Sequence, residues 1–121
     1  MERIVHDNNL RAAHWATVIL EGGSACGIVS TEGPTAGWVH NVSVIPEKRG
    51  KGLGNALLSA IEEVAVENLG RTRLYLNTDP KTAKWYKRHG WRHLKNCRTG
   101  GHGHLVTLIK ILSDNDPLAN N

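Results

Sequence analysis

Hydrophobic and polar positions alternate with a period of two in the first part of the chain. The apolar segments Trp15–Leu20 and Ala25–Val29, separated by Gly22 and Gly23, predict two strands that form a hairpin. Trp38–Ile45 predicts a third strand, because its residues alternate between two sides. In that alternation Val39, Asn41 and Ser43 share one side, and His40, Val42 and Val44 share the other.

Helical spacing begins after Pro46, which ends the third strand because proline cannot donate to a ladder. Apolar residues recur every three or four positions from Leu53 to Ala65, and Gly70 is expected to adopt a left-handed conformation after this helix. Arg71–Asn77 then predicts a fourth strand.

A second helix is marked at both ends. Asp79 can cap it, Pro80 suits its first position and Gly90 can end it. Trp91–Cys97 and His104–Leu112 predict two more strands. The order strand, strand, strand, helix, strand, helix, strand, strand predicts an α/β or α+β fold with a right-handed helical crossover. We expect one domain over residues 1–112 and a loose polar tail over residues 113–121.

Composition is that of an ordinary soluble protein, with 121 residues of which 40% are hydrophobic and 21% charged. The two cysteines, Cys26 and Cys97, have neither CxxC nor metal-ligand spacing, which favours a reducing compartment. There is no signal-peptide pattern at the N-terminus and no apolar run of about 20 residues. We therefore expect a cytoplasmic protein that does not enter a membrane.

Charge is unevenly distributed around a net value of +4. No Asp or Glu lies between Pro80 and Ser113, whereas eight basic residues do: Lys81, Lys84, Lys87, Arg88, Arg92, Lys95, Arg98 and Lys110. This segment is either a solvated basic face or an attractive surface for a polyanion, such as a phosphorylated cofactor or a nucleic acid. Charge alone does not distinguish these two interpretations of the segment.

Residues 47–55, EKRGKGLGN, lie between the third strand and the first helix. Glycines at 50, 52 and 54 permit tight turns and leave backbone N–H groups uncovered at the positive end of the helix dipole, which is a typical anion site. A Walker loop would need Ser or Thr after Lys51, and a dinucleotide fingerprint would need glycine at Asn55. The alternative is a glycine-rich turn without a ligand.

Two segments together resemble a known family. Val42–Leu58, VSVIPEKRGKGLGNALL, is similar to the acyl-CoA motif of the GNAT superfamily of N-acetyltransferases, in which R-x-x-G-x-G follows a strand and a proline; Arg49, Gly52 and Gly54 match it. Tyr86, followed by Gly90 and Trp91, matches the end of the next motif of the family. The resemblance extends from about Trp15 to Leu112 and implies a mixed, mostly antiparallel sheet with two main helices.

The resemblance also implies a mechanism, in which acetyl-CoA donates its acetyl group to a primary amine that attacks directly. Backbone groups of Val42 and Val44 would bind the pantetheine arm and the thioester carbonyl. Tyr86 would be the general acid that protonates the leaving thiolate, although it could also be only a core tyrosine. The pyrophosphate would be bound by the loop and the helix start, namely by Arg49, Gly50, Lys51, Gly52, Leu53, Gly54 and Asn55.

The chain departs from the family pattern in three places. His40 stands where many members have a glutamate base, and it is either the base, acting through water, or an ordinary strand histidine. Asp79 stands at the position of a frequent asparagine, so it binds the cofactor or only caps the helix. Only residues 1–14 precede the hairpin, where the family usually has a strand and two helices. The acceptor site would then be open or completed by a second subunit, as in a homodimer.

Several functions remain open. The acceptor amine can belong to a small molecule, a peptide or a protein. The basic segment also permits a toxin-like enzyme that acetylates aminoacyl-tRNA, and the N-terminal departure permits a CoA-binding module without catalysis. Histidines at 89, 93, 102 and 104 lack a recognisable third ligand, so we expect no metal.

Overall fold

The computed structural model describes residues 3–10, 13–30, 37–98 and 104–119. The chain divides into two compact units, residues 1–71 and 72–121, and each is described by itself. The seven strands of the described residues form two sheets in which every pairing is antiparallel. The two main helices and the antiparallel sheets confirm the predicted α/β or α+β class and identify it as α+β.

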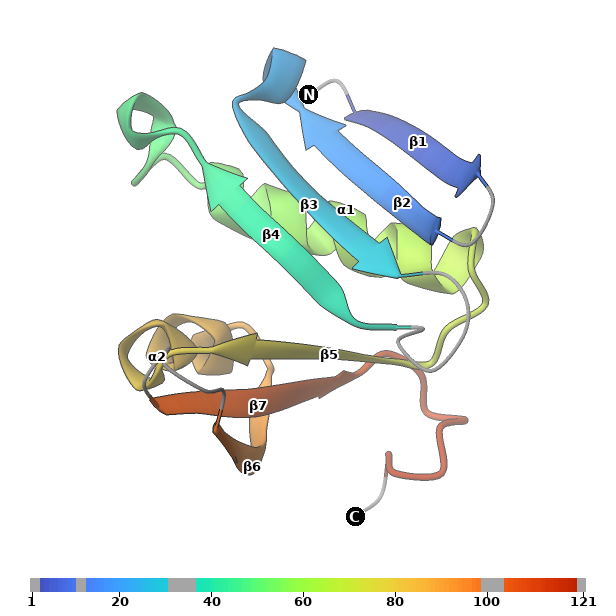
Figure 1. Cartoon of the computed structure of the whole chain (residues 1–121), viewed down its shortest axis with the longest axis vertical. Coiled ribbons are helices and arrows are strands. Elements are labelled where there is room, and N and C mark those ends of the chain that lie inside the picture. Colours follow the sequence, from blue (N-terminus) through green and yellow to red (C-terminus); the bar gives the residue numbers. More distant parts are fainter. Residues whose placement is uncertain (1–2, 11–12, 31–36, 99–103, 120–121) are drawn as a thin grey trace. The chain divides into compact units, whose positions relative to one another are not determined.

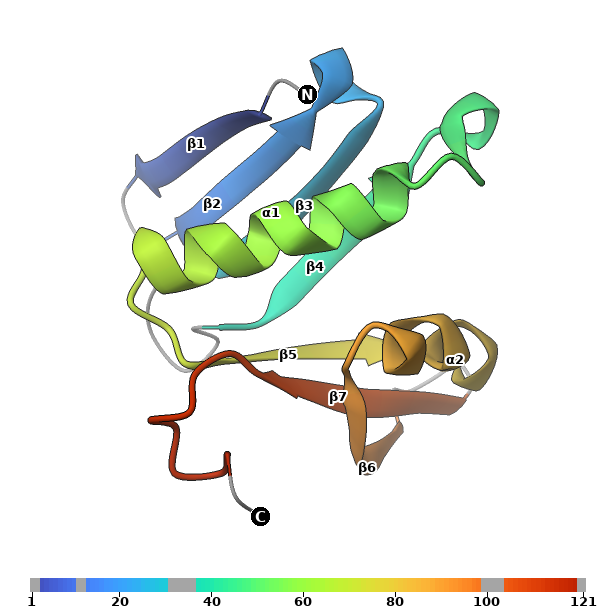
Figure 2. The same cartoon turned by 180° about the vertical axis from the view of Figure 1, so that it is seen from behind.

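The first unit is a four-stranded sheet with the order β1-β2-β3-β4. Helix α1 (Leu53–Glu67) packs on one face of this sheet, as Figures 1 and 2 show from opposite sides. The strands are β1 (Arg3–Leu10), β2 (Ala13–Leu20), β3 (Ala25–Ser30) and β4 (Val39–Val44). The sequence predicted β2, β3, β4 and α1, with bounds that differ by a few residues.

Strand β1 was not predicted, and it adds a fourth strand before α1. It pairs with β2 from Arg3 opposite Leu20 to Leu10 opposite Ala13. Its sequence, RIVHDNNL, contains Asp7, Asn8 and Asn9, which are residue types that strands disfavour. Such residues are tolerated here because β1 lies at the edge of the sheet. The predicted order of elements lacked this strand, and the structure adds it before the hairpin.

The core of the first unit lies between α1 and the alternate residues of β2 and β3. Val18, Val29 and Ile61 are fully buried there. Gly27 of β3 lies under Ile61, because a Cβ at Gly27 would come within 2.6 Å of Ile61 Cδ1. The absence of a side chain at this position therefore allows α1 to lie close to the sheet.

Gly27→Ala is expected to destabilise the protein by about 1–3 kcal/mol through overpacking. Ile61→Val removes the opposing Cδ1 atom and alone costs about 0.5–1.5 kcal/mol. The double variant should lose less stability than the two single losses combined, as measured by urea unfolding of all three variants. Purely additive losses would show that Gly27 and Ile61 do not oppose each other.

The second unit is a three-stranded sheet with the order β5-β7-β6. Its strands are β5 (Arg73–Thr78), β6 (Arg92–Arg98) and β7 (His104–Ile111), and helix α2 (Pro80–Arg88) follows β5. Figure 1 shows α2 beside this sheet. Buried side chains from β5, α2 and β7, together with Trp91 just before β6, form its core: Leu74, Leu76, Ala83, Tyr86, Trp91, Val106, Leu108 and Ile109.

The C-terminal tail contains a buried anchor, although the sequence led us to expect a loose segment. Asp116 is 3% exposed, and its carboxylate accepts hydrogen bonds from Thr72 Oγ1 at 2.6 Å and Arg73 Nε at 2.9 Å. The backbone N–H of Leu118 donates to the same carboxylate. These hydrogen bonds, that from Thr72 first, lower the pKa of Asp116. Residues 113–119 thus belong structurally to the second unit.

Candidate functional site

Strand β4 forms the edge of the first sheet, so among the described strands of this sheet one side of its backbone has no partner. Ile45 N–H donates to Ser24 C=O at 2.9 Å, which fixes the hydrogen-bonding alternation along β4. Ser43, two residues earlier, therefore also directs its N–H and C=O toward β3. Val44 and, by the same alternation, Val42 direct theirs away from β3. The sequence predicted that these two backbones would contact a ligand, and the register directs both away from β3.

The side chains of β4 are distributed over the two faces of the sheet differently from the prediction. Val39 lies opposite Val29 and Val44 lies opposite Ala25, so both valines share the face that α1 covers. A bulge makes this possible, with a register shift opposite Gly27 and a φ of 54° at Asn41. His40 and Ser43 lie on the other face, where Ser43 Oγ is 3.7 Å from Cys26 Sγ. The expectation that His40 shares a side with Val42 and Val44 is therefore wrong.

The segment between β4 and α1 has the geometry of an anion loop. A short turn, η3 (Pro46–Lys48), is followed by Gly50 with φ 78° and Gly52 with φ 82°. A Cβ at either glycine would meet no atom within 4 Å, so the left-handed backbone, rather than a lack of space, favours glycine here. Gly52 is the N-cap of α1 and provides no side-chain hydrogen bond.

The start of α1 therefore presents uncapped donors. Ala56 is the first residue whose backbone N–H donates to an acceptor of the helix, namely Gly52 C=O. The backbone N–H groups of the three residues before it, Leu53, Gly54 and Asn55, therefore have no acceptor within the helix. No acidic residue occupies the first turn of α1. The positive end of the helix dipole is thus unopposed within the helix, which suits an anion.

Arg49 connects this loop to the strand edge. Its Nε donates to Val44 C=O at 2.9 Å. This bond confirms that the Val44 carbonyl points away from β3, and it leaves the two terminal nitrogens of the guanidinium for other acceptors. A planar guanidinium held at one nitrogen can bind a phosphate group with the other two.

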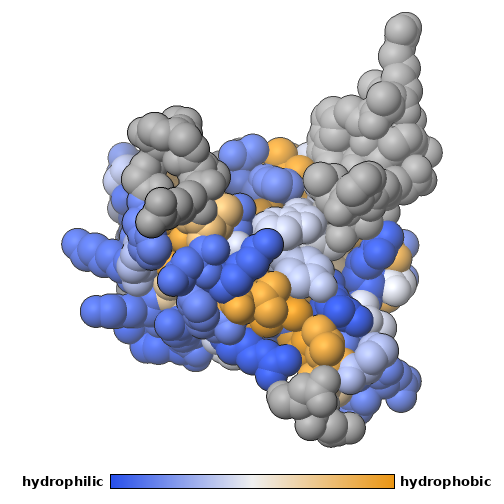
Figure 3. Space-filling model, turned by 60° about the horizontal axis from the view of Figure 1, so that its bottom comes forward, coloured by the Kyte–Doolittle hydropathy of each residue, from blue (hydrophilic) through white to orange (hydrophobic). Residues whose placement is uncertain are grey.

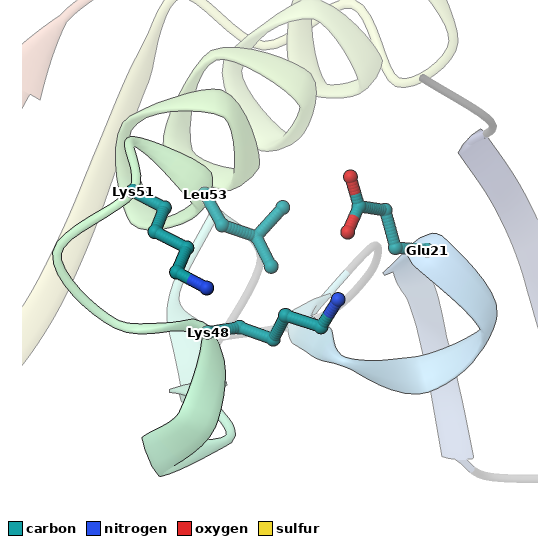
Figure 4. Close-up of a pocket in the computed structure, with 4 residues that line it drawn as sticks. All are labelled: Glu21, Lys48, Lys51 and Leu53. Carbon is teal, nitrogen blue, oxygen red and sulfur yellow. The ribbon is translucent and has the colours of Figure 1, made fainter.

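A cavity of about 240 Å³ lies beside the helix start, and Glu21, Lys48, Lys51 and Leu53 line it. Figure 4 shows the two lysines extending from the loop toward this space, with the Glu21 carboxylate facing them from the turn η1 (Glu21–Gly23). The volume suits a charged group rather than a whole cofactor. Glu21 was missed in the sequence, because a residue of the β2–β3 hairpin carries no local sign of its closeness to a loop 25 or more positions later.

Tyr86 and Asp79 both belong to the second unit. Asp79 caps α2 as predicted: its carboxylate accepts from Thr82 N–H at 2.8 Å and from Thr82 Oγ1 at 2.7 Å, and these bonds lower its pKa. Tyr86 is 7% exposed and makes edge-to-face contacts with Trp85 and Trp91 at ring-centroid distances of 5.0 and 5.8 Å. Burial raises the pKa of the Tyr86 phenol, which keeps it protonated at neutral pH.

Sequence comparison with family models identifies the relationship. Residues 11–93 match the model of the acetyltransferase (GNAT) domain. The chain belongs to the GNAT family. It is therefore an acyltransferase, as its sequence motifs predicted. A search of curated proteins gives no significant match.

Solved structures of this family have the same fold. A Lactobacillus plantarum protein assigned as an N-acetyltransferase is 20% identical, with a TM-score of 0.70 over 89% of this chain and 75% of that one. An aminoglycoside 6'-N-acetyltransferase in complex with coenzyme A is 13% identical, with a TM-score of 0.68, and the match covers 82% of this chain and 73% of that one. A spermidine N-acetyltransferase chimera that includes Vibrio cholerae sequence is 14% identical, with a TM-score of 0.66, and the match covers 88% of this chain and 71% of that one.

Two further findings concern the described part of the GNAT chain. No helix in it is long and apolar enough to cross a membrane. Within residues 3–10, 13–30, 37–98 and 104–119, no group of three or more His, Cys, Asp or Glu side chains is placed to hold a metal ion. His102 lies outside the described residues.

Proposed function

We propose that this GNAT protein transfers the acetyl group of acetyl-CoA to a primary amine by direct attack. The observation that carries the proposal is the anion loop between β4 and α1, with left-handed backbones at Gly50 and Gly52 before an uncapped helix start. Arg49, Gly50, Lys51, Gly52, Leu53, Gly54 and Asn55 would bind the pyrophosphate there. Such a site distinguishes a CoA ligand from an uncharged acyl donor.

The strand edge supplies the second part of the proposal. The pantetheine arm, which contains two amides, would hydrogen-bond to the edge backbone of Val42 and Val44 as an added strand does. One N–H of this edge would donate to the acyl carbonyl oxygen and stabilise the negative charge that forms on it. Removal of a comparable donor costs about 3–4 kcal/mol of transition-state stabilisation in other enzymes.

Proton transfer completes the proposed reaction. The amine nitrogen attacks the acyl carbon, the carbon–sulfur bond breaks, and the sulfur leaves as a thiolate. Tyr86 would donate its phenolic proton to that thiolate, while the proton of the attacking amine goes to a base. Asp79, whose two carboxylate oxygens accept from Thr82, would affect the cofactor through its capping of α2.

Direct attack is tested by kinetics together with mass spectrometry. Initial rates with varied acetyl-CoA and amine should give intersecting, sequential patterns, and protein incubated with acetyl-CoA alone should carry no acetyl group on Cys26 or Cys97. Parallel lines together with a stable acetyl-protein adduct would instead indicate a covalent intermediate.

His40 is the predicted base, and its exposed position on β4 requires proton transfer through water. His40→Ala is expected to lower turnover about tenfold on the limb of the pH–rate profile that rises toward alkaline pH. The exposed His93 offers a control, since His93→Ala should leave the profile unchanged. An unaltered rising limb in His40→Ala would remove His40 from the mechanism.

One observation favours a second class of acceptor, the amine of an aminoacyl-tRNA. Residues 72–121 carry nine Lys and Arg but three Asp, whereas residues 1–71 carry six Lys and Arg against eight Asp and Glu. Exposed cations of the second unit lie on α2 and β6: Lys81, Lys84, Lys87, Arg88, Arg92 and Lys95. Figure 3 shows hydrophilic side chains gathered over part of one face, with small hydrophobic patches between them. Binding of tRNA through this charge should weaken steeply with salt.

A further inference from the structure

Glu21 lies across from the phosphate loop because the register of the sheet brings two turns together. Ala25 pairs with Val44, and Ile45 N–H donates to Ser24 C=O at 2.9 Å. The β2–β3 turn, which begins at Glu21, therefore lies at the same end of the first sheet as the β4–α1 loop. The Glu21 carboxylate lines the cavity that Lys48 and Lys51 also line (Figure 4).

We propose that Glu21 is a specificity-determining residue that opposes the phosphate groups of the cofactor. The inference rests on the proposed function, because it requires that the loop binds CoA. Two lysines favour a polyanion in the cavity, and a carboxylate in the same wall offsets part of their attraction. Glu21 thereby lowers the affinity for the more highly charged forms of the cofactor.

The contacts of Glu21 agree with this role. Among the residues that the structure describes, neither Lys48 nor Lys51 forms an ion pair with Glu21, so its carboxylate remains available to repel a phosphate. Glu21 has a φ of 47°, in the left-handed region that glycine adopts more readily than glutamate. Gly22 and Gly23, with φ of 65° and 103°, continue the turn. Glycine at position 21 would therefore preserve the turn while removing the charge.

Ligands of decreasing charge give the sharpest test. CoA carries a pyrophosphate and a 3'-phosphate, dephospho-CoA carries only the pyrophosphate, and pantetheine carries neither. Dissociation constants of the three ligands would be measured by calorimetry for the wild-type chain, Glu21→Gln and Glu47→Gln. Glu47 is an exposed acid of the neighbouring turn η3 that does not line the cavity, so its variant is a matched control for charge removal.

Glu21→Gln should bind CoA about three- to tenfold more tightly at low salt, dephospho-CoA less so, and pantetheine without change. Glu47→Gln should change each constant by less than about twofold, and added salt should reduce the difference between Glu21→Gln and wild type. Glu21→Gly should reproduce the gain in affinity.

Two kinds of result would overturn the inference alone. Equal CoA affinity in wild type and Glu21→Gln would show that the carboxylate does not oppose the phosphates, and weaker binding by Glu21→Gln would show that it contributes a favourable contact. In either case CoA still binds, so the proposed function would stand. Absence of CoA binding by the wild type and by every variant would instead overturn the proposed function itself.

Discussion

Tyr86→Phe is expected to lower kcat by a factor of about 10² to 10⁴, the range observed for loss of a positioned general acid. The variant keeps the aromatic ring that contacts Trp85 and Trp91, so the second unit should remain folded. Only the phenolic hydroxyl is lost, and with it the proton donor, so the thiolate must then leave unprotonated. The dissociation constant of acetyl-CoA should stay within about twofold of the wild-type value, because that affinity is assigned to the first unit.

The other tyrosine of the chain provides the control. Tyr75→Phe removes a hydroxyl that accepts a hydrogen bond from Arg73 at 3.3 Å, and it should leave kcat nearly unchanged. The wild-type kcat should fall only above the ordinary pKa of tyrosine, because burial raises the pKa of Tyr86, and this decline should disappear in Tyr86→Phe. A Tyr86→Phe enzyme with wild-type kcat would exclude the phenol as the acid.

Gly52→Ala is expected to weaken acetyl-CoA binding about 10- to 100-fold. Alanine disfavours the φ of 82° at this position, so the backbone should shift and turn the N–H groups of the helix start away from the pyrophosphate. Each tenfold loss corresponds to about 1.4 kcal/mol of binding free energy. The same strain should reduce the free energy of unfolding by about 1–2 kcal/mol.

The variant Gly70→Ala serves as a control that separates the loss of acetyl-CoA affinity from the loss of stability. It follows the opposite end of α1 with φ 63°, and a Cβ at Gly70, like one at Gly52, would meet no atom within 4 Å. Gly70→Ala should therefore lose similar stability in urea unfolding yet bind acetyl-CoA like the wild type in calorimetry. Equal affinities of the two variants would contradict the assignment of the loop as the pyrophosphate site.

Elements with strong local signals could be predicted from the sequence. Asp79, Pro80 and Gly90 mark α2 by capping and turn chemistry, and the structure confirms the cap on Thr82 and the left-handed Gly90. Gly70 likewise has the expected left-handed backbone after α1. The glycines and cations of the loop between β4 and α1 are contiguous in sequence, so their association could be inferred without knowledge of the fold.

Features that depend on tertiary structure could not be predicted in this way. Strand β1 is held by its pairing with β2, not by its own β-propensity. The bulge at Asn41 moves His40 to the other face of β4, and strict alternation cannot anticipate such a bulge. Glu21 comes close to the β4–α1 loop only through the register of the sheet, and Asp116 is anchored by residues more than 40 positions earlier.

The most direct test of the account is amine-dependent release of free CoA from acetyl-CoA, followed by detection of the new thiol. The purified protein would be assayed with panels of small amines, peptides, proteins and aminoacyl-tRNA, and acetylated products would be identified by mass spectrometry. The account predicts thiol release that requires an amine, matches the amount of N-acetylated product and falls sharply in Tyr86→Phe. The account would be contradicted if the protein neither bound acetyl-CoA nor consumed it with any acceptor.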